Sequence, residues 1–403
     1  MNIDFATHFI PEFRRSFRAR DDGGPDRRRY HEIAAGLSDV IALNSGDPDL
    51  TAAPAAVDAA IDALRRGKTH YVFGGLPELR AAIVRKLRLE NGVIVPSEHQ
   101  VIVTNGSAEA ATAVFQTLLE PGDEVLTTIP YYGGHVGAIK AARGIPVTIP
   151  TNGDRLWEPD PGDVDARITP KTKAFIFANP GNPTAAVYRR ETLEALLDIA
   201  RRRRILMIAD ELFERYVYDG HRHVSMASLP ESADWVVTIN GFSKSYCMTG
   251  WRLGWVIAPP WLLPPLDQMR YAMSMAAASA NQWGGVAALS DAARPYYDEV
   301  HRTYGERRAF FLKALGEMGL AQRPTPGAFV GMLDVRKIGR SSAEMWETIL
   351  REARIAMSSG GAFGPQAEGW LRYSLIQPFD RLREAASRLA PVVRRLLTDA
   401  GYS

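Results

Sequence analysis

The chain has 403 residues, of which 46% are apolar and 23% are charged, and its formal net charge is +2. These values are ordinary for a globular protein and give no sign of a nucleic-acid or membrane partner. A chain of this length exceeds one small core, so we expect a large domain with a smaller companion.

The cysteine content and the apolar pattern bear on where the protein works. The single cysteine, Cys247, excludes an internal disulfide and fits a reducing compartment. The first residues lack the basic segment and apolar run of a signal peptide, and no apolar stretch approaches the roughly 18–20 residues that a membrane-spanning helix needs. We therefore expect a cytoplasmic protein.

Helical patterns alternate with short apolar runs from about residue 52 to residue 300. Such alternation predicts an α/β fold with a mainly parallel sheet that helices cover on both faces. The expected helices include residues 53–66, 76–90 and 107–119. The expected strands are residues 101–104, 124–129, 146–149, 174–178, 205–209, 236–239 and 253–258.

The last hundred residues differ in character from this alternating region. A long helical pattern at 296–318 precedes strand candidates at 329–334 and 371–375, and a helix is expected at 380–400. We predict a large domain at residues 51–300 and a smaller α+β domain at 301–403. Residues 1–50 are expected to form an N-terminal arm and part of the small domain.

A lysine follows a strand-like run in INGFSKSYCMTGWRLGW, residues 239–255. This residue, Lys244, stands in a turn, and Arg252 lies eight residues on between Gly250 and Gly254. A lysine in such a loop is usually only exposed. A lysine held near a carbonyl and partly desolvated instead forms a Schiff base, and an arginine in a glycine-bounded loop suits a phosphate dianion.

Two further motifs stand at strand ends. Asp210 closes the apolar run LMIAD, and a carboxylate there faces the crevice where parallel sheets bind ligands, although it also suits a helix cap. The run FANPGNPT, residues 177–184, carries two Asn-Pro pairs. One pair marks a turn, whereas the doubled motif indicates a rigid turn that fixes the amide of Asn182.

Two more strand ends carry a possible anion site and a pair of aromatic rings. In VTNGSA, residues 103–108, the chain turns through Gly106 into a helix, and backbone N–H groups at such a turn can hold a phosphate. TIPYYGGH, residues 128–135, places Tyr131 and Tyr132 after a strand, where one ring is suited to stack on a flat ligand or simply to pack.

Together these residues resemble the class I/II aminotransferases, which are pyridoxal-phosphate (PLP) enzymes of fold type I. The resemblance runs from about residue 40 to 378, in the family's order: LNSGDPD, HYVFGGLPELR, the Gly-Ser turn, PYY, NPGNPT, ADELF, SKSYCMTGWRLG, PTPGAF and GWLRYS. It implies a large domain with a mainly parallel sheet of the seven-stranded type, a smaller α+β domain, and PLP as cofactor.

The resemblance also implies roles around the cofactor ring. Lys244 would hold PLP as a Schiff base and carry the proton of the substrate α-carbon. Asp210 would pair with the pyridine nitrogen, and Tyr132 would stack on the ring. Asn182 would donate to the ring oxygen and lie against the substrate. The cofactor phosphate would be held by Gly106, Ser107, Ala108 and Arg252.

The remaining implied roles concern the substrate and a second subunit. Arg372 would grip the α-carboxylate of an amino acid, helped by the backbone of Gly46. Tyr71 would reach the phosphate of the neighbouring subunit, so the family implies a homodimer. We also place His135 among the substrate-binding residues, as a second acid or base or as a structural histidine. No metal is implied.

Four positions depart from the family's pattern. Phe213 stands where a tyrosine usually bonds the cofactor's phenolic oxygen, and His135 stands where a tyrosine is common. Ala185 replaces a glycine, and Gly241 replaces a serine. Losing a donor to the phenolate alters how the cofactor shares charge.

These departures leave two enzymatic hypotheses and one of another class. The leading hypothesis is an aminotransferase acting on an L-amino acid. The runner-up is an aminotransferase-like PLP enzyme of specialised metabolism that eliminates, cyclises, decarboxylates with deamination or oxidises with O2. A PLP-binding transcription regulator would need a DNA-binding domain, for which the first forty residues show no pattern. The substrate is not named by the sequence, although Arg270 is one candidate for recognising an acidic side chain.

Overall fold

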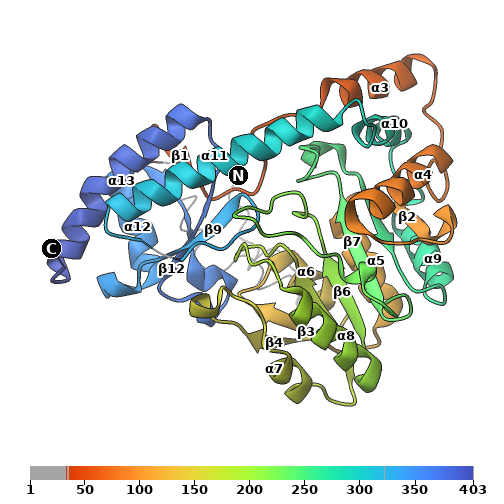
Figure 1. Ribbon diagram of the computed structural model, residues 1–403, viewed down its shortest axis with the longest axis horizontal. Coiled ribbons are helices and arrows are strands. Elements are labelled where there is room, and N and C mark those ends of the chain that lie inside the picture. The colour runs from red at the N-terminus through yellow and green to blue at the C-terminus, as the bar shows by residue number, and fades with distance from the viewer. Residues whose placement is uncertain (1–32, 34–35, 322, 403) are drawn as a thin grey trace, which may run out of the picture.

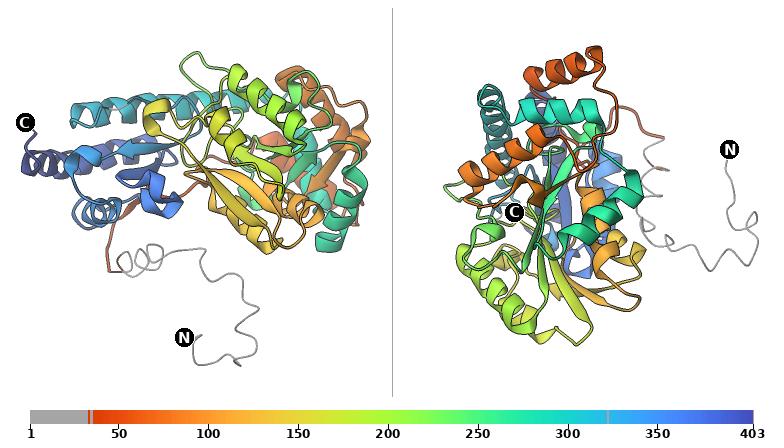
Figure 2. Two further views of the ribbon diagram at one scale, coloured as in Figure 1. Left: turned by 90° about the horizontal axis from the view of Figure 1, so that it is seen from below. Right: turned by 90° about the vertical axis from the view of Figure 1, so that its right-hand side faces the viewer.

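The computed structural model describes residues 33, 36–321 and 323–402, so most of the expected N-terminal arm lies outside the described residues. Figures 1 and 2 show an elongated molecule, with the C-terminal helices gathered at one end and a large sheet at the other. The C-terminus lies at the far tip of the smaller end (Figure 1).

A seven-stranded sheet forms the centre of the large part, in the order β2-β8-β7-β6-β5-β3-β4. Its strands are apolar along nearly their whole length because helices cover both faces. β8 alone runs antiparallel to its neighbours, β2 and β7. The strands are β2 (Val101–Thr104), β3 (Glu124–Ile129), β4 (Ile145–Pro150), β5 (Thr172–Ala178), β6 (Leu206–Asp210), β7 (Val236–Gly241) and β8 (Gly254–Ile257). The predicted mainly parallel sheet is confirmed.

Several helices around this sheet begin where proline fixes the backbone. Pro54, Pro77 and Pro161 each stand in the first turn of a helix, where a missing N–H costs nothing. The helix expected at 76–90 is α-helical only to Lys86 and continues as a π-helical turn to Asn91. The helices are α3 (Pro54–Arg65), α4 (Pro77–Lys86), α5 (Ser107–Leu118), α6 (Gly133–Ala141), α7 (Pro161–Ala166), α8 (Arg190–Arg203), α9 (Leu263–Ser274) and α10 (Ser279–Ala288).

The C-terminal part packs three helices against small sheets. α11 (Arg294–Glu317) runs along the molecule from the region of α3 to that of α13 (Figure 1). A three-stranded antiparallel sheet has the order β11-β12-β9. The remaining elements of this part are α12 (Ser342–Ala353), α13 (Phe379–Asp399), β9 (Val330–Asp334), β10 (Ile355–Ala356), β11 (Ser358–Ser359) and β12 (Trp370–Ser374).

Segments from the two ends of the chain meet in a two-stranded parallel sheet. β1 (Ile41–Ala42) pairs with β10, and backbone bonds from Ile41 and Leu43 extend this pairing. The residues before the large part thus join the C-terminal part. In the part of the chain that the structure describes, no helix is both long and apolar enough to span a bilayer.

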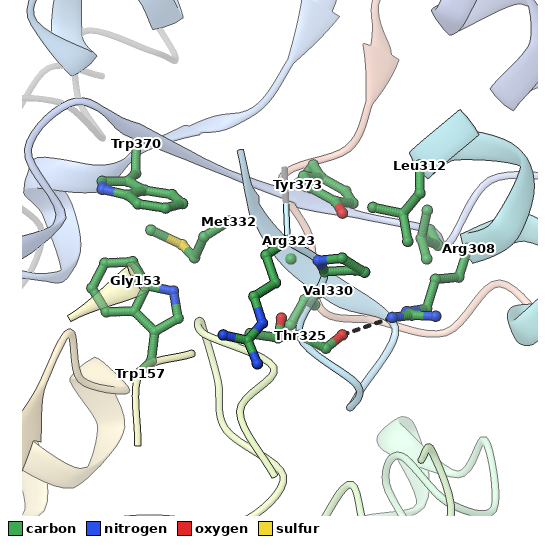
Figure 3. A pocket seen from close by; sticks show the side chains of 13 residues that line it. Gly153, Trp157, Arg308, Leu312, Arg323, Thr325, Val330, Met332, Trp370 and Tyr373 are labelled. Atoms are coloured by element: carbon green, nitrogen blue, oxygen red, sulfur yellow. Dashed lines mark hydrogen bonds between the residues drawn. The ribbon is translucent and has the colours of Figure 1, made fainter. Parts of the chain in front are cut away.

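A pair of tryptophans connects the C-terminal sheet to the large part. Trp370 of β12 and Trp157, from the segment after β4, lie edge to face with ring centroids 4.9 Å apart. Figure 3 shows both rings beside Met332 of β9. Gly153 permits this contact, because a Cβ on it would lie 2.4 Å from the Trp370 ring. The contact fixes one end of β12, the strand that carries Arg372.

Candidate active site

The last residue of β6 places a carboxylate at the carboxyl edge of the large sheet. Asp210 is buried, and its Oδ1 accepts a hydrogen bond from the backbone N–H of Leu212 at 3.1 Å. Its Oδ2 lies 2.8 Å from Nε2 of His135. Asp210 thus lies at the carboxyl end of a parallel strand, the edge at which such sheets bind ligands.

His135 comes from the first turn of α6 and is buried. Its ring stands edge to face with that of Tyr132, with centroids 5.2 Å apart. The bond to Asp210 gives the imidazole a protein partner, which favours the structural interpretation of His135 over a direct contact with substrate. Tyr132 itself remains 45% exposed, so one ring face is open to a ligand.

Lys244 lies in the loop between β7 and β8, and its Nζ donates a hydrogen bond to the carbonyl of Gly46 at 2.8 Å. The hydroxyl of Tyr216 donates to the backbone carbonyl of Lys244 at 2.9 Å, and this bond helps to fix the loop. Burial lowers the pKa of Lys244, and the charges of Arg372 and Arg252 lower it further. A lowered pKa supplies the neutral amine that a nucleophilic lysine needs.

A glycine turn and an arginine lie together in an arrangement suited to an anion. Gly106 precedes the first residue of α5 and has a φ of 82°. A Cβ on Gly106 would lie 2.5 Å from Nη2 of Arg252, so only glycine permits this approach. Arg252 is exposed and donates to the carbonyls of Thr249 and Asn105 at 2.8 and 3.4 Å. The free N–H groups at the start of α5, including those of Ser107 and Ala108, complete the arrangement.

Arg372 reaches the site from β12 and is buried. Its Nη1 donates to the carbonyl of Asn44 at 2.9 Å, while its Nε has no partner within the described residues. Burial lowers the pKa of Arg372 to about 10. A buried guanidinium with unused donors is suited to a carboxylate ligand. Gly46 lies beside it, since a Cβ there would be 3.3 Å from Nη2.

Other predicted residues take varied positions. Asn182 is half-buried in the turn after β5, where both Asn-Pro peptide bonds are cis. Ala185, which replaces the family's glycine, has a φ of 56° in the left-handed region. Tyr71 lies on an exposed face, stacked on Phe73 with centroids 5.8 Å apart.

Phe213 is buried one turn after Asp210, with its ring 5.1 Å from that of Phe329. Tyr216, three residues later, was not predicted from the sequence, because only the fold brings its hydroxyl to the Lys244 loop.

Arg270, the candidate for recognising an acidic side chain, is buried and donates to Asp267 and to the carbonyl of Met275. Its charge therefore already has partners in the protein.

A buried charged cluster also follows β6. Glu211, Glu214 and His223 place potential ligand atoms within 4.8 Å of one another. The ammonium of Lys86 donates to one oxygen of Glu214, and Asn91 donates to the other at 2.7 Å. Because both oxygens of Glu214 are occupied and Lys86 offsets its charge, we interpret the cluster as an ion pair rather than a metal centre.

Comparison with known proteins decides the family. The family model described as "Aminotransferase class I and II" matches residues 38–389. The chain belongs to this family. An aspartate aminotransferase of Pyrococcus abyssi is 35% identical over 369 residues, which cover 91% of this chain and 95% of the relative. An arginine–pyruvate transaminase of Pseudomonas aeruginosa is 36% identical over 90% of this chain and 92% of its own length.

Solved structures of the family share the fold of this chain. The aspartate aminotransferase of Thermus thermophilus with maleate superposes with a TM-score of 0.84 at 33% identity, covering 91% of this chain and 94% of that one. An aromatic aminotransferase of Pyrococcus horikoshii gives 0.85 at 33% identity, over 92% and 98%. The predicted family, the type I fold and the assignment as an aminotransferase are thus confirmed, and diverted chemistry is not favoured.

Proposed function

We propose that this aminotransferase uses PLP bound to Lys244 to transfer the amino group of an L-amino acid. The observation that carries the proposal is the half-buried amine of Lys244, which donates to the carbonyl of Gly46 and whose pKa is lowered by burial and by the charges of Arg372 and Arg252. The residues present suit the cofactor, because the cradle at Gly106 would be filled by a Cβ. The Nε of Arg372, which has no partner among the residues that the structure describes, likewise suits a carboxylate substrate.

The residues that would hold PLP come from several strand ends. Its phosphate would bind at Arg252 and the start of α5, and its ring would lie against Tyr132. Asp210 would keep the pyridine nitrogen protonated, supported by its bond to His135. Asn182 would donate to the ring oxygen. When bound, PLP supplies an electron sink for the charge that develops at the substrate α-carbon.

The residues that would act on the substrate are Lys244 and Arg372. Arg372 would bind the α-carboxylate in two hydrogen bonds and orient the amino acid, beside the backbone of Gly46. The amine of Lys244, once released from the cofactor, would take the proton from the substrate α-carbon and deliver it to a carbon of the cofactor. Transamination needs no group beyond these to move a proton, which fits the partnered state of His135.

We propose a homodimer in which Tyr71 reaches the partner's phosphate site. Tyr71 is 66% exposed, and it shares its face with the exposed rings of Phe73 and Tyr271. An aromatic patch of this kind on a protein surface commonly marks an interface. Light scattering should give twice the mass of the chain, and Tyr71→Phe should weaken PLP binding without changing that mass.

We also propose the class of donor substrate, the domain bounds and the cellular location. Relatives are named for aspartate, aromatic amino acids and arginine, so we propose a proteinogenic L-amino acid as donor. We keep the predicted domains at 51–300 and 301–403, with part of 1–50 joined to the second. A cytoplasmic location fits the single cysteine.

The test is an anaerobic spectrum of the PLP-loaded protein with a panel of single amino acids and no keto acid. Conversion to pyridoxamine phosphate with the matching keto acid would establish transamination and name the substrate. Lys244→Ala should remove the visible band of lysine-bound cofactor. A coloured species that decays only when O2 enters would instead support the runner-up, for which Phe213 is the one specific observation.

A further inference from the structure

A short segment of the chain contacts both Lys244 and Arg372 through its backbone. We call residues 44–49 the strap. Its carbonyls accept hydrogen bonds from two site residues, Gly46 from Lys244 at 2.8 Å and Asn44 from Arg372 at 2.9 Å. The strap thus contacts the groups proposed to bind cofactor and substrate, although it contributes only backbone atoms to them.

Two aspartates fasten the strap at different places. Asp49 accepts from Arg307 at 2.7 Å and from Tyr304 at 2.9 Å, which ties it to α11. Asp47 accepts from the hydroxyl of Thr249 at 2.6 Å, in the loop that also carries Lys244. Thr249 in turn accepts from Arg252 through its backbone carbonyl at 2.8 Å. Asp47 therefore joins the strap to the lysine loop itself.

We propose that Asp47 is a positioning residue for Lys244. Its carboxylate, held by Thr249, fixes the strap so that the Gly46 carbonyl lies against the amine and stabilises the protonated form. This role rests on the proposed function of Lys244 as the cofactor lysine, and nothing in that function requires a carboxylate at this position.

The electrostatics around the amine agree with this geometry. Burial lowers the pKa of Lys244, and among the charges that act on the amine Asp47 is the strongest that raises it. The other charged groups facing the amine are Arg372, Arg252 and Asp210. Arg372 and Arg252 favour the neutral amine, whereas Asp210 acts in the same direction as Asp47 but more weakly.

The sign of the effect can be measured on the full-length protein freed of PLP. Capture of added PLP, followed by its visible band, requires the neutral amine, so its rate rises with pH through the pKa of Lys244. Asp47→Asn removes the charge that favours the protonated amine. The midpoint of the pH–rate profile should therefore fall by roughly 0.2–0.7 pH unit, and capture below it should be roughly 1.5- to 5-fold faster.

Three further variants complete the experiment. Asp58→Asn, on the exposed surface of α3, changes the net charge equally and should keep the wild-type midpoint. Thr249→Val should shift the midpoint in the direction of Asp47→Asn, because it frees the carboxylate, and Thr249→Ser should restore it.

Each outcome bears on one of the two proposals. A midpoint in Asp47→Asn equal to that of wild type or of Asp58→Asn overturns the role of Asp47. A capture rate that changes equally at every pH also overturns it, because such a change would reflect general attraction of an anionic cofactor. A wild-type midpoint in Thr249→Val overturns it as well. If the wild-type protein captures no PLP at Lys244, the proposed function fails instead.

Discussion

The bond between His135 and Asp210 allows a test that separates support of the carboxylate from proton transfer. Both side chains are buried, and Nε2 lies 2.8 Å from Oδ2. His135→Leu leaves that oxygen without its partner, and a hydrogen bond to a charged group contributes about 1.5–3 kcal/mol. We expect urea unfolding of the PLP-free protein to show a loss of about 2 kcal/mol.

His135→Gln is the matched variant, because a glutamine amide can place an N–H near the position of Nε2 but cannot exchange a proton. We expect it to retain most of the stability and to keep turnover within about threefold. A general acid or base contributes about 10²- to 10⁴-fold to rate. If Gln and Leu variants both lose more than 100-fold in kcat while Gln remains stable, the positioning role is refuted and His135 transfers a proton.

Three further predictions concern the surroundings of the site. Burial alone would raise the pKa of Glu214, but the charge of Lys86 holds it below its ordinary value of 4.5. The stabilisation by the Lys86–Glu214 pair should therefore be complete above pH 4.5 and be lost as the pH falls further. Lys86→Met should lower the free energy of urea unfolding at pH 7 by about 3–5 kcal/mol. The double variant Lys86→Met/Glu214→Gln should recover part of this stability. Trp157→Ala should cost about 3–5 kcal/mol, because the ring is buried against Trp370, whereas a change below 1 kcal/mol would show that β12 does not depend on this contact. Phe213→Tyr should shift the pH midpoint of the visible PLP band to lower values if its ring faces the cofactor oxygen, and an unchanged titration would place it elsewhere.

The sequence predicts the large sheet well because each of its strands is a nearly continuous apolar run between turn residues. The runs at 101–104 and 124–129 match β2 and β3 residue for residue. The antiparallel direction of β8 was not predicted, because an apolar run is the same read either way. The π-helical turn after Lys86 was also missed, since its apolar spacing continues that of α4.

In the site, likewise, local sequence predicts the positions of some residues but not their contacts. Motifs located Asp210, Gly106 and Arg252, because a carboxylate at a strand end or a glycine turn before a helix has a position that local sequence determines. The partners of these groups depend on packing between distant segments. His135 and Asp210 are 75 residues apart in the chain, and no local pattern reports that α6 turns this imidazole towards β6.

The pairing of β1 with β10 has a consequence for the order in which the protein forms during synthesis. Ile41 finds its partner strand only at Ile355, so more than three hundred residues must leave the ribosome before this pairing closes. The large sheet, complete by β8, can assemble much earlier. The N-terminal end of the segment that contacts Lys244 is therefore anchored only after nearly the whole chain has been made, whereas the bonds of Gly46 to Lys244 and of Asp47 to Thr249 need only the residues up to 249.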